Sequence, residues 1–116
     1  MAGIVERYLD AIVSHDWDVV GECVVDGIIR VGPYGDRFEG RDDYLAYISD
    51  TMPKLKSYAM EIHRVTYAND GLAFAELSET VEFDGEAMLT PEVLVFAIDS
   101  DHRITRVDIF IQTLHR

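Results

Sequence analysis

A carboxylate interrupts each of two apolar rows in the second half of the chain. Alternate residues of segment 72–83 place Glu79 in one row, and alternate residues of segment 87–99 place Glu92 in another. Alternation of this kind turns one row of a β-strand toward the core. Burial of a carboxylate is costly unless it is paired, so such groups are candidates for acid/base work. The two rows are Ala73, Ala75, Leu77, Glu79, Val81 and Phe83, and Glu92, Leu94, Phe96 and Ile98.

Each glutamate also has a structural interpretation. A β-bulge would turn Glu79 to the outer face of its strand, or an ion pair would neutralise it there. Glu92 directly follows Pro91 and also fits an exposed strand end. If both acids face one cavity, we expect a coupled pair that shares one proton and supplies an acid and a base.

Arg30 and Tyr8 are the polar residues that we predict to accompany the two acids. Ile29 and Val31 flank Arg30, so apolar alternation alone would leave the guanidinium in solvent. An inward Arg30 would instead be a natural partner of Glu79. Tyr8 lies at the edge of an apolar helical stripe, where its hydroxyl fits either the rim of the core or a ligand contact.

Apolar and aromatic side chains complete the predicted site. Small-molecule pockets are lined mainly by such residues around a few polar groups. Aromatic residues are also common in cores, so packing is the alternative role for each of them. The predicted substrate-binding contacts are Arg30, Glu92, Trp17, Tyr34, Tyr44, Leu94, Phe96 and Ile109.

Metal and cofactor chemistry is not expected from this sequence. The four histidines are dispersed, and neither an HxH nor an HExxH spacing occurs. Cys23 is the single cysteine, which excludes an internal disulfide and a cysteine-based zinc site. The chain has no glycine-rich phosphate loop, nucleophile elbow or dinucleotide fingerprint. We therefore predict no metal and no cofactor.

The elements that must position these residues are three helices followed by long strands. Apolar residues recur at helical spacing in the first third, and Pro53 ends the third helix. Hairpin signals then follow at Asn69-Asp70-Gly71 and Asp84-Gly85. We predict one α+β domain over residues 1–116, a cone of three helices on one face of a curved, mostly antiparallel sheet. The predicted helices are 4–13, 17–24 and 41–52, and the predicted strands are 28–31, 58–67, 72–83, 87–99 and 104–113.

Composition limits the partners. The 116 residues carry 22 acidic and 10 basic side chains, a formal net charge of −12. That balance disfavours nucleic acid and anionic membranes, which Lys and Arg recognise. The N-terminus lacks the apolar run of a signal peptide, and no stretch approaches the ~20 apolar residues of a membrane span. A cytoplasmic location is therefore expected.

The last two predicted strands are apolar on both faces. Val93, Val95 and Phe110 belong to the row that should face away from the helices. Continuous apolar runs imply burial on both sides of a strand. Because three helices cover one face only, we predict that a second copy of the chain covers the other, forming a homodimer.

The order of elements and several short segments resemble the nuclear transport factor 2-like superfamily over essentially the whole chain. Within it, the sequence is most similar to SnoaL-like polyketide cyclases, ketosteroid isomerases and limonene epoxide hydrolases. This superfold hosts enzymes, binders and interaction modules. The segments that carry the resemblance are Glu6-Arg7-Tyr8-Leu9, His15-Asp16-Trp17, Gly32-Pro33-Tyr34-Gly35, Phe38-Glu39-Gly40-Arg41-Asp42 and Ile98-Asp99-Ser100-Asp101-His102-Arg103-Ile104-Thr105.

The catalytic groups of these enzymes match the sequence only in part. The isomerase tyrosine matches Tyr8, but its general-base aspartate matches Gly32 and its second oxyanion-hole acid matches Leu94. In those isomerases that second acid is kept protonated by its apolar surroundings. One aspartate of the epoxide hydrolases matches Glu79. Their arginine and last aspartate match Leu77 and Ile109, so the resemblance implies that both mechanisms are broken here.

The resemblance also points Arg30 into the cavity and implies a small-molecule pocket. We expect this chain to bind or transform a small hydrophobic compound, such as a polyketide, terpenoid or steroid-like molecule. An enzyme of this kind would be a cofactor-free isomerase, cyclase or hydrolase using Glu79 and Tyr8 as catalytic residues. The alternative is a non-catalytic binding or dimerisation module whose pocket is filled by Phe96, Tyr44 and Trp17.

Overall fold

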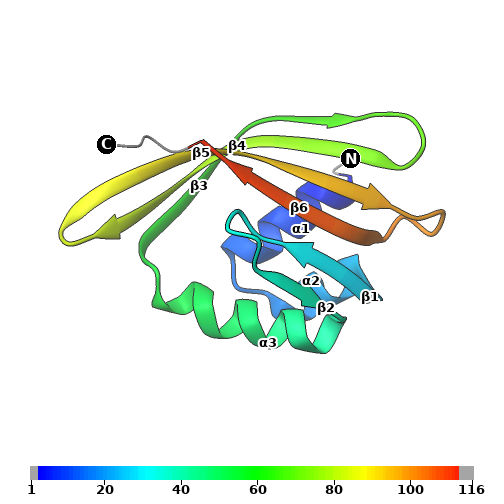
Figure 1. The fold of residues 1–116 in the computed structure, drawn as a ribbon, viewed down its shortest axis with the longest axis horizontal. Helices are drawn as coiled ribbons and strands as arrows, with labels where there is room; N and C mark the ends of the chain where they lie inside the picture. Colours follow the sequence, from blue (N-terminus) through cyan, green and yellow to red (C-terminus); the bar gives the residue numbers. More distant parts are fainter. Residues whose placement is uncertain (1–2, 113–116) are drawn as a thin grey trace.

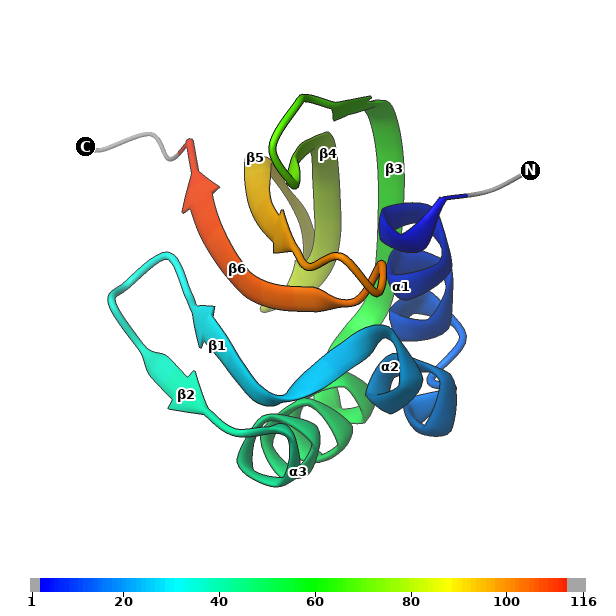
Figure 2. The same ribbon diagram turned by 90° about the vertical axis from the view of Figure 1, so that its right-hand side faces the viewer.

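Three helices lie on one side of a six-stranded curved sheet in the computed structural model, which describes residues 3–112 (Figures 1 and 2). The strand order is β2-β1-β6-β5-β4-β3, and every neighbouring pair is antiparallel except β1 and β6. The predicted α+β architecture is therefore confirmed. The elements are α1 (Ile4–Val13), α2 (Trp17–Cys23), β1 (Val24–Val31), β2 (Arg37–Glu39), α3 (Arg41–Thr51), the 3₁₀ turn η1 (Met52–Lys54), β3 (Lys56–Tyr67), β4 (Leu72–Phe83), β5 (Glu86–Ile98) and β6 (Ile104–Ile111).

Local signals explain where the helices begin and end. The Asp16 carboxylate caps α2 by accepting a hydrogen bond from the Val19 amide. Pro53 removes a backbone donor, so α3 gives way to η1 after Thr51. Both long hairpins turn through left-handed pairs, Asp70-Gly71 and Asp84-Gly85, which suit the twist of the strands they join.

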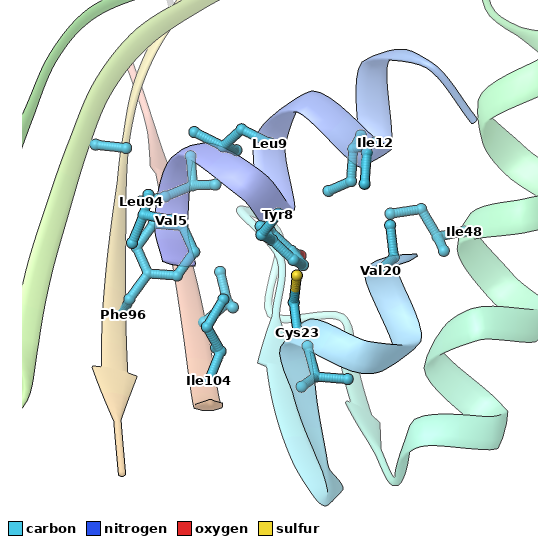
Figure 3. Packing of buried hydrophobic residues seen from close by; sticks show 14 of the residues in the cluster. Val5, Tyr8, Leu9, Ile12, Val20, Cys23, Ile48, Leu94, Phe96 and Ile104 are labelled. Atoms are coloured by element: carbon cyan, nitrogen blue, oxygen red, sulfur yellow. The ribbon is translucent and has the colours of Figure 1, made fainter. Parts of the chain in front are cut away.

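The core lies between α1 and the central strands (Figure 3). The α1 side chains meet Phe96 of β5, whose ring stands edge-on to Tyr8 with centroids 5.8 Å apart. Regular apolar spacing on α1 thus buries one helix face against alternate residues of β5 and β6. The fully buried members of this contact include Val5, Tyr8, Leu9, Phe96, Ile104 and Val107.

Strands β1, β2 and β6 differ most from their predicted ranges. β1 starts at Val24 rather than Ile28, directly after α2, and the short β2 was not predicted. A bulge between Val24 and Ile29 breaks the register with β6, which disturbs the alternation that sequence patterns rely on. β6 is described only to Ile111, and the predicted end at Thr113 lies outside the described residues.

Within residues 3–112, no helix has the length and apolar character that crossing a membrane requires.

Candidate functional site

Pairing between β4 and β5 brings the two glutamates together. Leu77 lies opposite Glu92 and Glu79 lies opposite Thr90, so the two acids are diagonal neighbours on the inner face. Both line a pocket of about 360 Å³ at the open end of the sheet. This pocket is formed by β1 and the turn after it, by α3, and by the strands β4, β5 and β6. Its lining residues are Arg30, Pro33, Tyr34, Asp36, Tyr47, Glu79, Glu92, Ile109 and Ile111.

The carboxyl groups of Glu79 and Glu92 are within hydrogen-bonding reach of each other. Glu92 is only 8% exposed, and burial is the main reason that its pKa rises to about 9. The hydrogen bond and negative charge of Glu79 add to this rise, and Arg30 opposes it. Glu92 is thus the acid of the pair that holds a proton at neutral pH.

Tyr58 holds Glu79 from the other side. The Tyr58 hydroxyl donates a hydrogen bond to Oε2 of Glu79 across the β3–β4 pair. Burial, followed by the nearby Glu79 carboxylate, raises the pKa of Tyr58 well above its usual value, so the phenol remains a donor. The sheet therefore brings a protonated Glu92 and a Glu79 carboxyl group that accepts a hydrogen bond from Tyr58 to the same pocket.

The Arg30 side chain points inward. The pattern of its sequence neighbours had left this direction open. Its Nη1 donates to Oδ2 of Asp36 at 2.7 Å, and its guanidinium lies 5.2 Å from the centre of the Tyr47 ring. Asp36, rather than Glu79, is the ion-pair partner. Ile28 and Arg30 of β1, with Gly32 directly after it, form the inner row, whereas Ile29 and Val31 lie on the other face of β1 and are only half-buried.

Gly32 makes room for the carboxylate of Asp36. A Cβ atom built at position 32 would lie 2.3 Å from Asp36 Oδ2, so any side chain there would displace the carboxylate. The turn returns the chain on itself, with the Gly32 amide donating to the Asp36 carbonyl at 2.7 Å. Asp36 was missed as a site residue because its position depends on this turn. The turn-rich sequence Gly32-Pro33-Tyr34-Gly35 was the only available signal.

Tyr8 and Tyr44 do not line the pocket. Their hydroxyl groups are hydrogen-bonded to each other in the closed core. Burial raises the pKa of Tyr8 to about 12, and the charges of Arg30 and Glu79 also act on it, so the tyrosine pair lies close behind the pocket. Leu94 and Phe96 belong to the same closed core.

The remaining predicted residues are divided between the pocket and the surface. Ile109 lines the pocket, and Tyr34 stands at its rim with 83% of its surface exposed. Trp17 stacks on His15 and lines a different hollow, beside Arg41 and Arg103. The structure thus brings together Glu79, Glu92, Arg30, Tyr34 and Ile109, and separates Trp17, Tyr8, Tyr44, Leu94 and Phe96 from them.

In the part of the chain that the structure describes, no three His, Cys, Asp or Glu side chains are grouped to hold a metal ion. The chemistry that the pocket itself offers is proton transfer between carboxyl groups, beside an arginine neutralised by Asp36.

Comparisons with known proteins agree with this fold. The sequence profile of the SnoaL-like domain matches residues 5–107, and the chain belongs to this family. A search of curated protein sequences found no match. The solved structures that resemble the chain share its nuclear transport factor 2-like fold.

Three of these structures are an LEH-like epoxide hydrolase of M. tuberculosis, a candidate SnoaL-like polyketide cyclase of Shewanella denitrificans OS-217, and a hypothetical protein of Catenulispora acidiphila DSM 44928 with a ketosteroid isomerase-like fold, in complex with trimethylamine. The epoxide hydrolase is 21% identical, with a TM-score of 0.80 over 94% of this chain and 80% of that one. The Shewanella protein is 12% identical, with a TM-score of 0.82 over 94% and 88%. The Catenulispora protein is 15% identical, with a TM-score of 0.80 over 92% and 83%.

Proposed function

We propose that this protein binds a small hydrophobic molecule in the pocket between β1, β4, β5 and β6 and transforms it by acid/base chemistry without a cofactor. The observation that carries the proposal is the Glu79–Glu92 pair inside a pocket with apolar walls. The pocket volume of about 360 Å³ lies in the usual range for small-molecule sites. Polyketide-, terpenoid- and steroid-like compounds are the substrate classes that we favour.

The two acids have different roles in this proposal. Glu92 carries the proton and serves as the general acid toward a substrate oxygen. Glu79, which accepts the Tyr58 hydrogen bond, serves as the general base toward a substrate carbon or a water molecule. Tyr58 is a positioning residue, because it acts on the substrate only through Glu79. Isomerisation, cyclisation and epoxide hydrolysis each need such a pair of proton transfers.

A second candidate function has its own supporting observation. The inner end of the cone is filled by Tyr8, Tyr44 and Phe96, all at most 2% exposed. A chain whose cavity is filled by its own side chains fits a non-catalytic binding or dimerisation module. The two functions differ in whether the remaining pocket accepts a ligand.

A ligand titration separates the two functions. We expect a monocyclic terpene epoxide or a short β-diketone to shift the methyl NMR signals of Ile109 and Ile111, which line the pocket. Any turnover of such a compound should fall at least ~10²-fold in Glu92→Gln, the usual loss for a removed general acid. Glu61→Gln, an exposed carboxylate on β3, is the matched control. Signals that stay unshifted with every compound would favour the interaction module.

We also propose that a second copy of the chain covers the outer face of the sheet. Val93 and Phe110 are directly paired there and are 36% and 60% exposed, with the half-buried Val95 beside them. Helices cover the opposite face only (Figure 2). An apolar patch on paired central strands is a typical interface feature.

Light scattering at micromolar concentration should therefore give about twice the 13.2 kDa chain mass. Phe110→Asp should convert the protein to the 13.2 kDa species, because it places a charge within the apolar face. Phe83→Asp is the control, since Phe83 is equally exposed but lies at the β4–β5 hairpin end. A wild-type protein that already scatters as a single chain would contradict this interface.

A further inference from the structure

The charges around the pocket are unequal. Three carboxyl groups, those of Asp36, Glu79 and Glu92, line it together with a single cation, Arg30. Arg30 is already engaged, because its Nη1 contacts Asp36 at 2.7 Å and only 12% of its side chain is exposed. The guanidinium charge is therefore balanced by Asp36, and the acid pair has no cation of its own within salt-bridge distance in residues 3–112.

Glu92 is a mostly buried carboxyl group with no cationic partner among the described residues. It lines the pocket, is 8% exposed, and receives no hydrogen bond from an N–H or O–H donor of the described chain apart from its shared contact with Glu79. Buried carboxylates are normally matched by donors or cations. Here the proton on Glu92 removes the negative charge of one of the two acids. A positively charged hydrogen-bond donor can replace that proton.

The walls of the pocket suit an organic cation rather than a metal ion. Tyr34 contributes an exposed aromatic ring, and Pro33, Ile109 and Ile111 contribute apolar surface, whereas the Tyr47 ring is already stacked on Phe38 and covered by Arg30. Aromatic faces attract cations, and apolar surface binds the rest of an organic molecule. The net charge of −12 also draws cations toward the protein from a distance.

We propose that the ligand of this pocket is a small hydrophobic amine, bound as its ammonium ion between Glu79 and Glu92. This inference rests on the proposed small-molecule pocket and not on the acid/base step, because an ammonium ligand leaves Glu92 ionised and unable to serve as the general acid. On binding, the ammonium N–H groups donate to the two carboxylates, and the proton of Glu92 leaves to solvent. The protein therefore exchanges one proton for one ammonium group, and no covalent bond to the ligand forms or breaks.

Three probes of one shape and different charge test the proposal: benzylammonium, benzyl alcohol and benzoate. Calorimetry at pH 7, in two buffers that differ in ionisation enthalpy, measures both affinity and proton release. We expect benzylammonium to bind at least ~10-fold more tightly than benzyl alcohol, with release of close to one proton, and benzoate to bind least. The groups that act on Glu92 in this titration are Glu79 on the adjoining strand β4, Tyr58 on β3 beyond it, and Arg30, itself paired with Asp36.

Glu92→Gln should abolish the proton release and remove most of the preference for benzylammonium. This variant keeps an amide donor for Glu79 and removes a buried acid, so it should remain folded. Glu61→Gln, outside the pocket, should behave as wild type.

The outcomes distinguish the two proposals. Equal or tighter binding of benzyl alcohol, or ammonium binding without proton release, would overturn the cation inference and leave the small-molecule pocket intact. Absence of binding by all three probes would overturn the cation inference, and Ile109 and Ile111 signals that stay unshifted with the terpene epoxide and the β-diketone as well would overturn the small-molecule pocket.

Discussion

Replacing Glu92 with glutamine should stabilise the protein, and the gain should grow as the pH rises. In the unfolded chain the carboxyl group ionises near its ordinary pKa of 4.5, whereas in the folded protein the pKa is about 9. Between these values the folded state binds one more proton than the unfolded state. Stability from this group is therefore fully present below pH 4.5 and is lost as the pH rises through 9, by about 1.4 kcal/mol per pH unit.

Glu92→Gln removes this loss, because glutamine carries no charge in either state. Relative to wild type, the variant should gain about 3 kcal/mol in unfolding free energy between pH 6 and pH 8. Urea unfolding at pH 6, 7 and 8, at one protein concentration, measures the gain. Glu61→Gln is the exposed-carboxylate control and should give a nearly constant difference. A Glu92→Gln difference that is equally independent of pH would show that Glu92 is ionised in the folded protein.

A stabilising Glu92→Gln variant with weaker ligand binding or turnover would also explain why a buried acid is present. Burial of Glu92 costs stability at neutral pH, and the proposed function would be the compensating benefit. This pattern is the trade-off between stability and activity that strained or desolvated sites commonly show. A variant that gains stability with unchanged ligand binding would instead assign Glu92 no role in the pocket.

Phe96→Ala should destabilise the fold by about 3–5 kcal/mol, the usual cost of removing a phenylalanine from a closed core. Phe96 is fully buried, and its ring packs edge-on against Tyr8 at 5.8 Å (Figure 3). The loss combines the transfer energy of the ring with the cavity left beneath α1. Chemical unfolding monitored by circular dichroism measures it.

The comparison for Phe96→Ala is Phe83→Ala, at the hairpin end of β4. Phe83 is 64% exposed, so its loss should change the unfolding free energy by less than about 0.5 kcal/mol. Similar values for the two variants would contradict the assignment of Phe96 to the core. A Phe96→Ala protein that stays stable and loses only ligand affinity would show that Phe96 is a ligand contact, as the sequence predicted.

The sequence by itself determined the elements of this fold. Helical spacing in residues 4–13 and strand alternation in residues 72–83 both match the structure, because their periods differ clearly. The turn pairs Asp70-Gly71 and Asp84-Gly85 are equally local, since left-handed backbone geometry restricts the residues that fit. The acids on the inner rows of β4 and β5 follow from the same alternation, and so does the apolar outer row at Val93 and Val95.

The tertiary structure alone decided how the polar groups combine. The registers of β3, β4 and β5 place Tyr58 beside Glu79 and Glu79 beside Glu92, and strand registers depend on contacts distant in sequence. The same packing buries Glu92, and this burial raises its pKa to about 9.

The turn after β1 shows most clearly how tertiary structure determines the site. In the sequence, Gly32 stands where the ketosteroid isomerases that the chain resembles carry a carboxylate, so no acid is expected there. In the folded chain, the turn brings the Asp36 carboxylate into the space that a side chain at position 32 would occupy. Arg30 then faces inward and pairs with Asp36 instead of pointing to solvent. Residue type and local alternation describe single positions, whereas a site is defined by where separate segments meet, and only packing determines that.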